Sequence, residues 1–434
     1  MKTKEVYIEQ DLFDGFYDDV DDSKSSTFQD NMKLPIHRWY RYTAGFSASW
    51  VGKLIEEEKV NGRKNIIDPF VGSGTVVIES GFHDVNAYGI ESHPYVYKIA
   101  QAKLQWRDFN KDELISQCLA VLESAKKKVV GDIDYPSLVS RCYPPETLRS
   151  LESLKLACLE VGNDKIQNFV WFIITSILRS VSPVGTAQWQ YVLPNRTKSK
   201  VLDPYDAYLQ KVRDIEHDIT SSENRISKRS ELAIFQDDAR SISSIPKGWG
   251  DLVITSPPYA NNYDYADALR LEMCFWNDIK GWKDLQSKVR VKLIRACTQH
   301  VGNQKEEIQK ILDSKILSPI AEELKEKYEL LDKEKENHGG KKNYHLMIVA
   351  YFYDLANVFR SLYEVTSDNC RMCFVIGDSA PYGIYIPVDE WLGKLAVSVG
   401  FKDYCFEKLR DRNVKWKNRK HRVPLKEGRL WINK

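Results

Sequence analysis

Strand-like and helix-like patterns of hydrophobic and polar positions alternate along this chain of 434 residues. From Lys64, a short apolar run is followed by a Gly/Ser turn and by an apolar segment that closes near Gly81, which predicts a strand, a loop and a helix. The segments NAYGIE and PYVYKIAQAKL then predict a second strand and a second helix, because Pro94 suits the first turn of a helix. This β-α-β-α order implies a parallel sheet.

Helical periodicity then interrupts the alternation, in segments 111–129, 145–161, 165–181 and 204–225. The β/α pattern resumes with strands in ELAIFQDDAR and DLVITSPPY, a helix in YADALRLEMCFWN, and, after a second polar helical stretch, further elements at 344–365, 370–377, 389–400, 403–410 and 428–433. We therefore expect an α/β fold whose core comprises 31–104 and 231–434, with mainly helical insertions at 105–230 and 280–341.

Composition adds few constraints, since 43% hydrophobic and 29% charged residues are ordinary for a folded globular protein. The longest apolar run, 169–174, is far shorter than the roughly 20 residues that span a bilayer, and the N-terminus lacks the apolar stretch of a secretory signal. Eight scattered cysteines, including the pair Cys370 and Cys373 in an apolar run, predict free thiols in a reducing compartment. We expect a cytoplasmic protein without a membrane segment.

Charge is distributed unevenly although the net charge is only +2. Residues 1–30 carry 3 Lys and 9 acids, which predicts an acidic mobile arm, whereas residues 402–434 carry 12 basic residues and 4 acids. The basic end is a candidate nucleic-acid surface, represented by Lys415, Lys417, Arg419 and Arg422. A second candidate is the loop with Arg196, Lys198 and Lys200, which follows Trp189 and Tyr191 and so combines cations with aromatic rings.

The glycine-rich turn Asp68–Thr75 brings backbone N–H groups close to a ligand, because glycine has no Cβ to block the approach. It is neither a dinucleotide fingerprint, which needs glycine where Val77 stands, nor a P-loop, which needs Gly-Lys-Ser/Thr. An acid before the turn suits a cationic amine, and Glu91 at the end of the second strand suits ribose hydroxyls. Together they favour S-adenosylmethionine as the cofactor.

The segment Thr255-Ser256-Pro257-Pro258-Tyr259 is the second chemical signal. Adjacent prolines continue neither a ladder nor a helix, so the strand Asp251–Thr255 must end in a stiff loop. Such a loop lies at the carboxyl edge of the sheet, where α/β proteins bind their ligands.

The motifs DPFVGSGT, GIESHP and TSPPY resemble those of the DNA methyltransferases that modify exocyclic amines of cytosine or adenine. The segment Ile36–Ser47 and the C-terminal RKHRVPLKEGRLWINK are also similar to that family, whereas the two insertions carry no assignable motif. The resemblance implies a Rossmann-like methyltransferase sheet, with the second insertion as a candidate target-recognition region.

The same resemblance implies residue roles. Ser256 and the Pro257 carbonyl would engage the amine and its ring neighbour, Pro258 would stiffen the loop, and Tyr259 would stack on the extruded base. Asp238, in preference to Asp237, would bind the adenine of the cofactor, and Tyr263 would line the base pocket. The full set of expected cofactor-binding residues is Phe46, Asp68, Phe70, Gly72, Ser73, Gly74, Thr75, Glu91, Asp238 and Thr255.

One related activity is excluded and several remain as alternatives. Carbon-5 methylation of cytosine is excluded, because it needs a nucleophilic cysteine beside a proline and no Pro-Cys dipeptide occurs. Serine before the prolines favours cytosine N4 over adenine N6, while tRNA guanine-N2 methylation and non-catalytic DNA recognition are weaker alternatives. The expected partners are double-stranded DNA and a cognate restriction endonuclease. The eight histidines, from His37 to His421, show no HxxH or HxH spacing and no apparent grouping with cysteine, so we expect no metal site.

Overall fold

The computed structural model describes residues 30–42, 44–186, 191–227, 229–261, 263–302, 304–412 and 423–434. Trp189, nearly all of the predicted acidic arm, and the predicted DNA contacts Lys415, Lys417, Arg419 and Arg422 lie outside these residues. Among the described helices, none is both long and apolar enough to cross a membrane.

The described strands are β1 (Asn65–Asp68), β2 (Asn86–Ile90), β3 (Val184–Thr186), β4 (Val192–Thr197), β5 (Leu232–Phe235), β6 (Gly250–Thr255), β7 (Thr366–Gly377), β8 (Asp403–Arg412) and β9 (Leu425–Asn433). The α-helices are α1 (Ala48–Val60), α2 (Thr75–Phe82), α3 (Pro94–Gln105), α4 (Lys111–Lys127), α5 (Ser137–Cys142), α6 (Pro145–Leu159), α7 (Asp164–Ile177), α8 (Pro204–Ser222), α9 (Arg270–Phe275), α10 (Trp282–Lys288), α11 (Lys305–Leu312), α12 (Ala321–Asn337), α13 (Tyr344–Val365) and α14 (Val388–Val399). Short 3₁₀ turns include η3 (His37–Trp39), η5 (Ala239–Ser241), η6 (Asp267–Leu269), η7 (Arg290–Lys292) and η8 (Thr298–His300).

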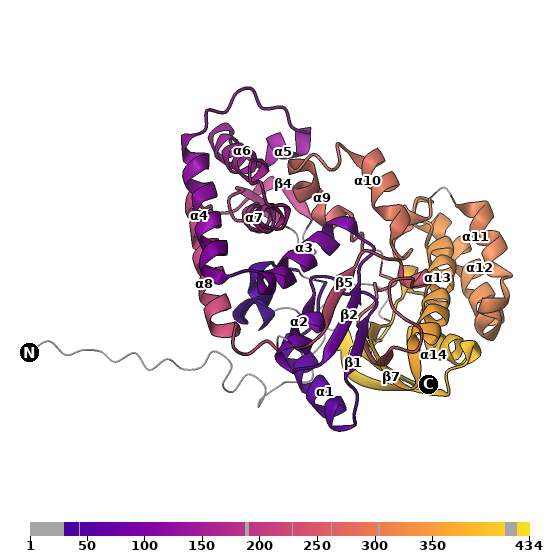
Figure 1. Ribbon diagram of the computed structural model, residues 1–434. Coiled ribbons are helices and arrows are strands. Elements are labelled where there is room, and N and C mark those ends of the chain that lie inside the picture. Colours follow the sequence, from indigo (N-terminus) through magenta and orange to yellow (C-terminus); the bar gives the residue numbers. More distant parts are fainter. Residues whose placement is uncertain are drawn as a thin grey trace, which may run out of the picture.

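Seven of the described strands form one sheet in the order β5-β2-β1-β6-β7-β9-β8 (Figure 1). The strands from β5 to β7 are parallel, whereas β9 pairs antiparallel with both β7 and β8. Strand β1 lies between β2 and β6, so the loops after these three strands open at one edge of the sheet. The predicted α/β fold, a Rossmann-like methyltransferase sheet, is confirmed.

Separate hydrophobic cores cover the two faces of the sheet. On one face, α1 and α2 pack against side chains such as Ile66 and Ile254; on the other, α13 and α14 pack against residues such as Ile67 and Val253. Cys370 belongs to the second core and Cys373 to the first, because an odd spacing along a strand places side chains on opposite faces. The C-x-x-C pair is therefore made of two buried core thiols.

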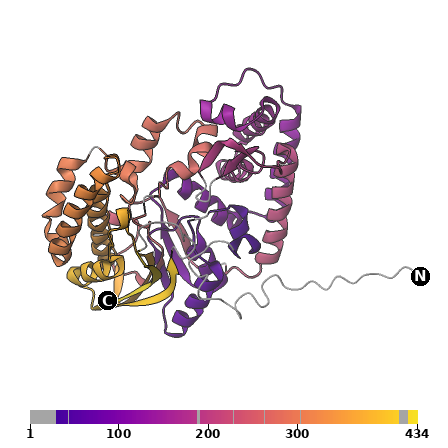
Figure 2. The same ribbon diagram turned by 180° about the vertical axis from the view of Figure 1, so that it is seen from behind.

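The helices α4 to α8 form a bundle at the end of the molecule opposite α11–α14 (Figure 2). Three of these helices begin where a polar side chain accepts the first free backbone N–H groups: Asn110, Asn163 and Asp203. The bundle is fixed to the core through Asp218 of α8, which accepts hydrogen bonds from Ile36 N, the Arg38 guanidinium and Trp39 Nε1. The helices predicted for 105–230 are all present.

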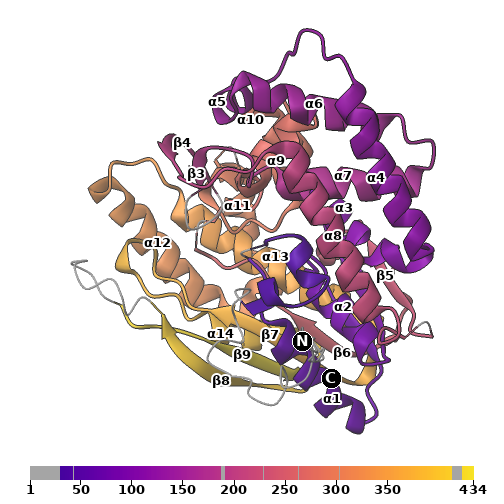
Figure 3. The same ribbon diagram turned by 90° about the vertical axis from the view of Figure 1, so that its left-hand side faces the viewer.

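The hairpin β3–β4 was not predicted. It contacts α5 and places Arg196 in a strand, where the sequence indicated a loop (Figure 3). Its strands are short and its second strand contains Pro194, so neither shows the alternation by which a longer strand is recognised. The described residues of 280–341 include the helices α10, α11 and α12 and several short 3₁₀ turns.

Candidate active site

The turn between β1 and α2 forms a cradle of backbone and carboxylate groups. Asp68 Oδ1 accepts a hydrogen bond from Phe70 N at 3.0 Å, and Glu91 Oε2 accepts one from Gly72 N at 3.0 Å. Gly72 and Gly74 have φ values of 52° and 92°, a conformation that favours glycine. A Cβ on Gly72 would also come within 3.0 Å of the Tyr42 ring, so the turn both needs glycine and is packed against the N-terminal segment.

A pocket opens above this cradle. Its walls come from the turn, the end of β2, the loop after β6, the N-terminal segment and the second insertion. They are formed by Tyr42, Ala44, Gly45, Phe46, Phe70, Val71, Gly72, Ser73, Thr75, Glu91, Ser92, His93, Ser256, Pro258, Tyr265, Leu293 and Ile294. Six expected cofactor residues thus line one pocket: Phe46, Phe70, Gly72, Ser73, Thr75 and Glu91. Gly74, Asp68 and Thr255 lie in the same turn or directly beside it.

Three buried polar atoms in and beside this pocket have no hydrogen-bond partner among the described residues: Asp68 Oδ2, Ser73 Oγ and His93 Nε2. Their side chains are 1–2% exposed. Burying a polar atom without a partner costs free energy, so these atoms fit a polar ligand that fills the pocket. The amine, ribose and carboxylate of S-adenosylmethionine would offer both donors and acceptors to them.

Burial also changes the protonation of the acids at the cradle. It raises the pKa of Asp68 to about 7 even though Thr255 and Phe70 N donate to the carboxylate. It likewise raises the pKa of Glu91 to about 7, against the backbone N–H groups of His93 and Gly72. A bound cation would restore both carboxylates to their charged form, which is consistent with a ligand that carries an ammonium and a sulfonium group.

Two residues of the cradle were not anticipated from the sequence. Lys103 on α3 is fully buried, its Nζ donates to Ser73 O at 2.9 Å, and burial lowers its pKa to about 7. His93 accepts from Tyr95 N at Nδ1, which leaves Nε2 as the N–H donor, and burial lowers its pKa to about 4. Lys103 gave no sequence signal, whereas His93 belongs to the GIESHP motif itself.

The loop after β6 is joined directly to the cradle. Thr255 Oγ1 donates to Asp68 Oδ1 at 2.6 Å, so the predicted cofactor acid and the first residue of TSPPY share a hydrogen bond. Ser256 and Pro258 line the pocket, Pro257 is buried, and Ser256 Oγ donates to Val375 O at 3.2 Å. The catalytic and cofactor residues predicted from separate motifs therefore converge on one site.

Tyr259 is held by the C-terminal strands. Its hydroxyl donates to Glu427 Oε1 at 3.0 Å, and Arg410 donates to the other carboxylate oxygen, Oε2, at 2.9 and 3.1 Å. The Arg412 guanidinium lies 5.3 Å from the centre of the Tyr259 ring, and burial raises the tyrosine pKa well above its usual value. Because Arg410 and Arg412 end β8, the tyrosine is linked to the point where the basic segment 413–422 begins.

The two acids considered for the cofactor adenine lie outside the pocket lining. Asp238 forms a bidentate pair with Arg240, through Oδ1 at 2.9 Å from Nε and Oδ2 at 2.7 Å from Nη2. Asp237 accepts hydrogen bonds from Ser243 and Ser244. A role for Asp238 in binding adenine would require its pair with Arg240 to open, and the assignment stays a prediction.

Some of the described residues that we expect to contact DNA are exposed, whereas others are bound to neighbouring residues of the protein. Arg196 and Lys200 are exposed, whereas Lys198 Nζ donates to the backbone oxygen of Arg179. Tyr263 is 7% exposed, with its ring centre 5.5 Å from Tyr191 and 4.5 Å from Tyr265. Tyr265, rather than Tyr263, lines the pocket.

Comparison with known proteins agrees with this geometry. The chain is 27% identical over 408 residues to the Type II methyltransferase M.AvaI of Nostoc sp., covering 87% of this chain and 81% of that protein. It is 25% identical to the Type II methyltransferase M.BsoBI of Geobacillus stearothermophilus, covering 90% and 83% of the two chains. The resemblance to methyltransferases is confirmed.

A third relative is the Type II methyltransferase M.MvaI of Kocuria varians, 23% identical over 282 residues and covering 58% of this chain and 59% of that one. No protein-family model matches the chain. The alignments with M.AvaI and M.BsoBI extend over most of the chain, so the likeness is not confined to the turn and the TSPPY loop.

Proposed function

We propose that this protein is a DNA methyltransferase that transfers the methyl group of S-adenosylmethionine to the N4 amine of cytosine in double-stranded DNA. The observation that carries the proposal is the hydrogen bond between Thr255 and Asp68. It joins the acid–glycine turn to the Ser256–Tyr259 loop at the ends of neighbouring strands β1 and β6, so a methyl donor and an amine acceptor would meet at one edge of the sheet.

In this proposal the cofactor supplies an electrophilic methyl group. Asp68 would bind its ammonium, Ser73 and Glu91 would contact its polar groups, and Phe46 and Phe70 would cover its apolar surface. The expected roles of Gly72, Gly74 and Thr75 follow from their place in the turn, where small or short side chains let the ligand approach the backbone.

On the acceptor side, an exocyclic amine is a weak nucleophile because its lone pair is conjugated with the base. Ser256 Oγ and the Pro257 carbonyl would hold this amine so that its lone pair points at the methyl carbon. The new N–C bond forms as the S–C bond breaks, and the surplus amine proton leaves to solvent. Tyr259 would stack on a base extruded from the duplex, since the amine is out of reach inside the stack.

DNA is the proposed substrate because exposed cations and an exposed aromatic ring lie in the segments flanking the site. Trp282 is 52% exposed with the Arg270 guanidinium 3.9 Å from its ring centre, and Arg196 and Lys200 are exposed in and after β4. We propose that Lys198, Tyr263 and the basic residues of 413–422 add to this surface. Leu293 and Ile294 bring the insertion 280–341 to the pocket wall, which supports its role in target recognition.

Restriction–modification is the proposed setting, with a cognate endonuclease as partner, because the similar proteins are named Type II methyltransferases. Adenine N6 is the second candidate acceptor, since its amine also lies beside a ring nitrogen and could use the same loop. Serine before the prolines favours cytosine.

The test is to incubate the protein and methyl-labelled cofactor with DNA of mixed sequence and, in parallel, with tRNA, then to digest each product and separate the nucleosides. Labelled N4-methylcytosine is expected, and a Ser256→Ala variant that still binds cofactor serves as the matched control. Labelled N6-methyladenine alone would show that the acceptor is the N6 amine of adenine and not the N4 amine of cytosine. Label in tRNA and none in DNA would refute the proposal.

A further inference from the structure

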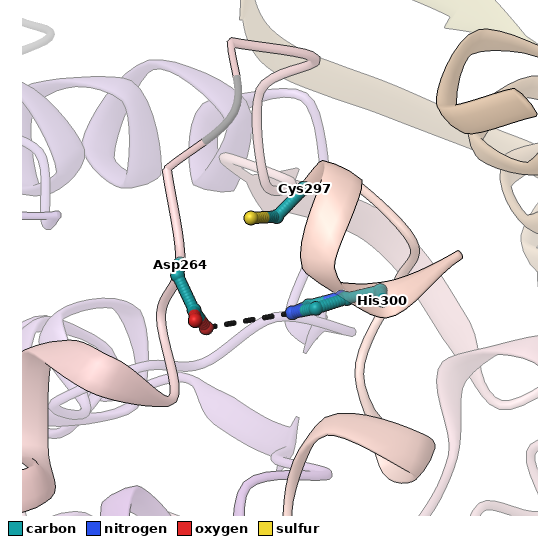
Figure 4. Close-up of side chains that lie close together, drawn as sticks. All are labelled: Asp264, Cys297 and His300. Carbon is teal, nitrogen blue, oxygen red and sulfur yellow. Dashed lines mark hydrogen bonds and ion pairs between the residues drawn. The ribbon is translucent and has the colours of Figure 1, made fainter. Parts of the chain in front are cut away.

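Three buried side chains of different chemistry meet beside the catalytic loop. Asp264 follows the TSPPY segment by five residues, whereas Cys297 and His300 belong to the second insertion, in and next to η8. Their oxygen, sulfur and nitrogen atoms all lie within 4.8 Å of one another. Figure 4 shows the three side chains pointing into a common space.

His300 turns one ring nitrogen toward Asp264. Its Nδ1 lies 3.2 Å from Ile294 O, a carbonyl that can only accept, so Nδ1 carries a proton and the neutral ring presents its lone pair at Nε2. Nε2 lies 3.5 Å from Asp264 Oδ1. When Nε2 is protonated it pairs with this carboxylate, and in the neutral ring a metal cation can take the place of that proton between the nitrogen and the oxygen.

The surroundings of Asp264 support the same interpretation. Arg290 binds the outer oxygen, Oδ2, through both Nε and Nη2, while Oδ1 faces His300 and accepts only longer bonds from Ala266 N and Asp267 N, at 3.2 and 3.4 Å. Metal-binding carboxylates and imidazoles are commonly fixed in this way by a second layer of hydrogen bonds. Arg290 and Ile294 O would supply that layer here.

Cys297 adds the third donor. Cys297 and His300 have the C-x-x-H spacing, and the 3₁₀ turn between them brings both side chains to one side. The neighbouring Gln299 is exposed, and Cys297 Sγ donates to its Oε1 at 2.5 Å. Sulfur, imidazole nitrogen and carboxylate oxygen together are a donor set of Zn²⁺.

We propose that Asp264, Cys297 and His300 bind one Zn²⁺ ion. Binding would form a zinc–sulfur bond and release the thiol proton to solvent, with the fourth position taken by water. The ion would tie the segment after the catalytic loop to the second insertion, next to Leu293 and Ile294 in the pocket wall. The prediction of no metal site rested on the absence of a grouping of histidine with cysteine, and the C-x-x-H spacing of Cys297 and His300 is such a grouping. The inference does not depend on the proposed function.

The first measurement is the metal content of the full chain, purified from zinc-supplemented cells and dialysed against metal-free buffer. We expect about one zinc per chain. After removal of zinc, added Co²⁺ should give the near-ultraviolet absorption band of a cobalt–thiolate bond. A wild-type protein with less than about a tenth of an equivalent of zinc and no cobalt–thiolate band would overturn the proposal.

Variants locate the site. Cys297→Ser should abolish the cobalt band, whereas Cys274→Ser, at a buried thiol on α9 outside the cluster, should keep it. His300→Asn should weaken zinc binding at least about tenfold while leaving the thiol in place. Circular dichroism would check that each variant is folded. If Cys297→Ser does not fold, the zinc content of the wild-type protein and the zinc affinity of His300→Asn test the proposal. A band of wild-type strength in folded Cys297→Ser would refute the assignment.

Discussion

The proposed cofactor cradle and the proposed catalytic loop adjoin each other but differ in how their polar groups are satisfied. In the cradle, Asp68 Oδ2 and Ser73 Oγ are buried and have no hydrogen-bond partner in the part of the chain that the structure describes. In the loop, Ser256 and Tyr259 already donate to Val375 O and to Glu427. The cradle therefore has buried polar atoms left for a ligand, whereas the loop would have to exchange existing partners to bind a base, so damage to the two regions should affect different steps.

The largest effect is expected at the cradle. Asp68→Ala removes the carboxylate proposed to bind the cofactor ammonium, and losing a charged hydrogen bond costs about 1–3 kcal/mol, up to a roughly hundredfold rise in Kd. Calorimetric titration with S-adenosylmethionine measures this. Glu57→Ala, at an exposed acid on α1, is the control. An unchanged Kd for Asp68→Ala would remove the cradle from the cofactor site.

The loop should respond in rate instead of cofactor affinity. Tyr259→Ala removes stacking on the base worth about 1–3 kcal/mol, so single-turnover methyl transfer should slow by roughly tenfold to a hundredfold. Ser256→Ala should also slow transfer, because an acceptor for the amine is lost. Cofactor binding should persist in both variants. Wild-type rates in both would show that TSPPY is not the catalytic loop.

The raised pKa values of the cradle predict a pH dependence that the loop should not share. Burial raises the pKa of Asp68 and of Glu91 to about 7, and a bound cation would lower both values. Cofactor affinity should therefore be full above pH 7 and fall as the pH falls below 7, by up to about tenfold per pH unit for each group. Titrations between pH 5.5 and 8 test this, and Asp68→Asn should flatten the profile. A flat wild-type profile would contradict it.

The smallest effect is expected where the loop meets the C-terminal strands. Tyr259→Phe keeps the stacking ring but removes the hydroxyl that donates to Glu427, which should cost about 1 kcal/mol, or about fivefold in rate. If Glu427 acts by positioning Tyr259, Glu427→Gln combined with Tyr259→Phe should be less than additive. The readout is kcat and KM measured separately. Additive losses would mean that Glu427 stabilises the fold without positioning the tyrosine.

The parts of this site that follow from local sequence could be predicted, and the parts that depend on distant packing could not. Asp68, the glycines and the stiff proline loop have local conformational reasons for their positions. Leu293 and Ile294 reach the pocket through the packing of an insertion more than 200 residues after the turn. Glu427 reaches Tyr259 because β9 pairs with β7 in a register that sets it opposite Gly377. No local pattern specifies that register.

The same contrast between features set by local sequence and features set by distant packing holds for the fold as a whole. Helices such as α13 and strands such as β6 lie where the sequence predicts them, because the length and period of an apolar run distinguish a helix from a strand. The hairpin β3–β4 is too short for either signal. For Asp238, a sequence motif predicts a contact with the cofactor, but the motif gives no sign of the pair with Arg240 that the fold forms.

The position of β6 has a consequence for how the chain folds during synthesis. β6 separates β1 from β7 in the sheet, yet 181 residues (69–249) lie between β1 and β6 in the chain. Until residue 255 has emerged from the ribosome, the edge of β1 that will pair with β6 has no partner, and an open apolar strand edge invites pairing with other chains. The helices α4–α8 emerge in that interval and can form local contacts early. A nascent chain that stalls between 235 and 250 should therefore be the species most prone to aggregate.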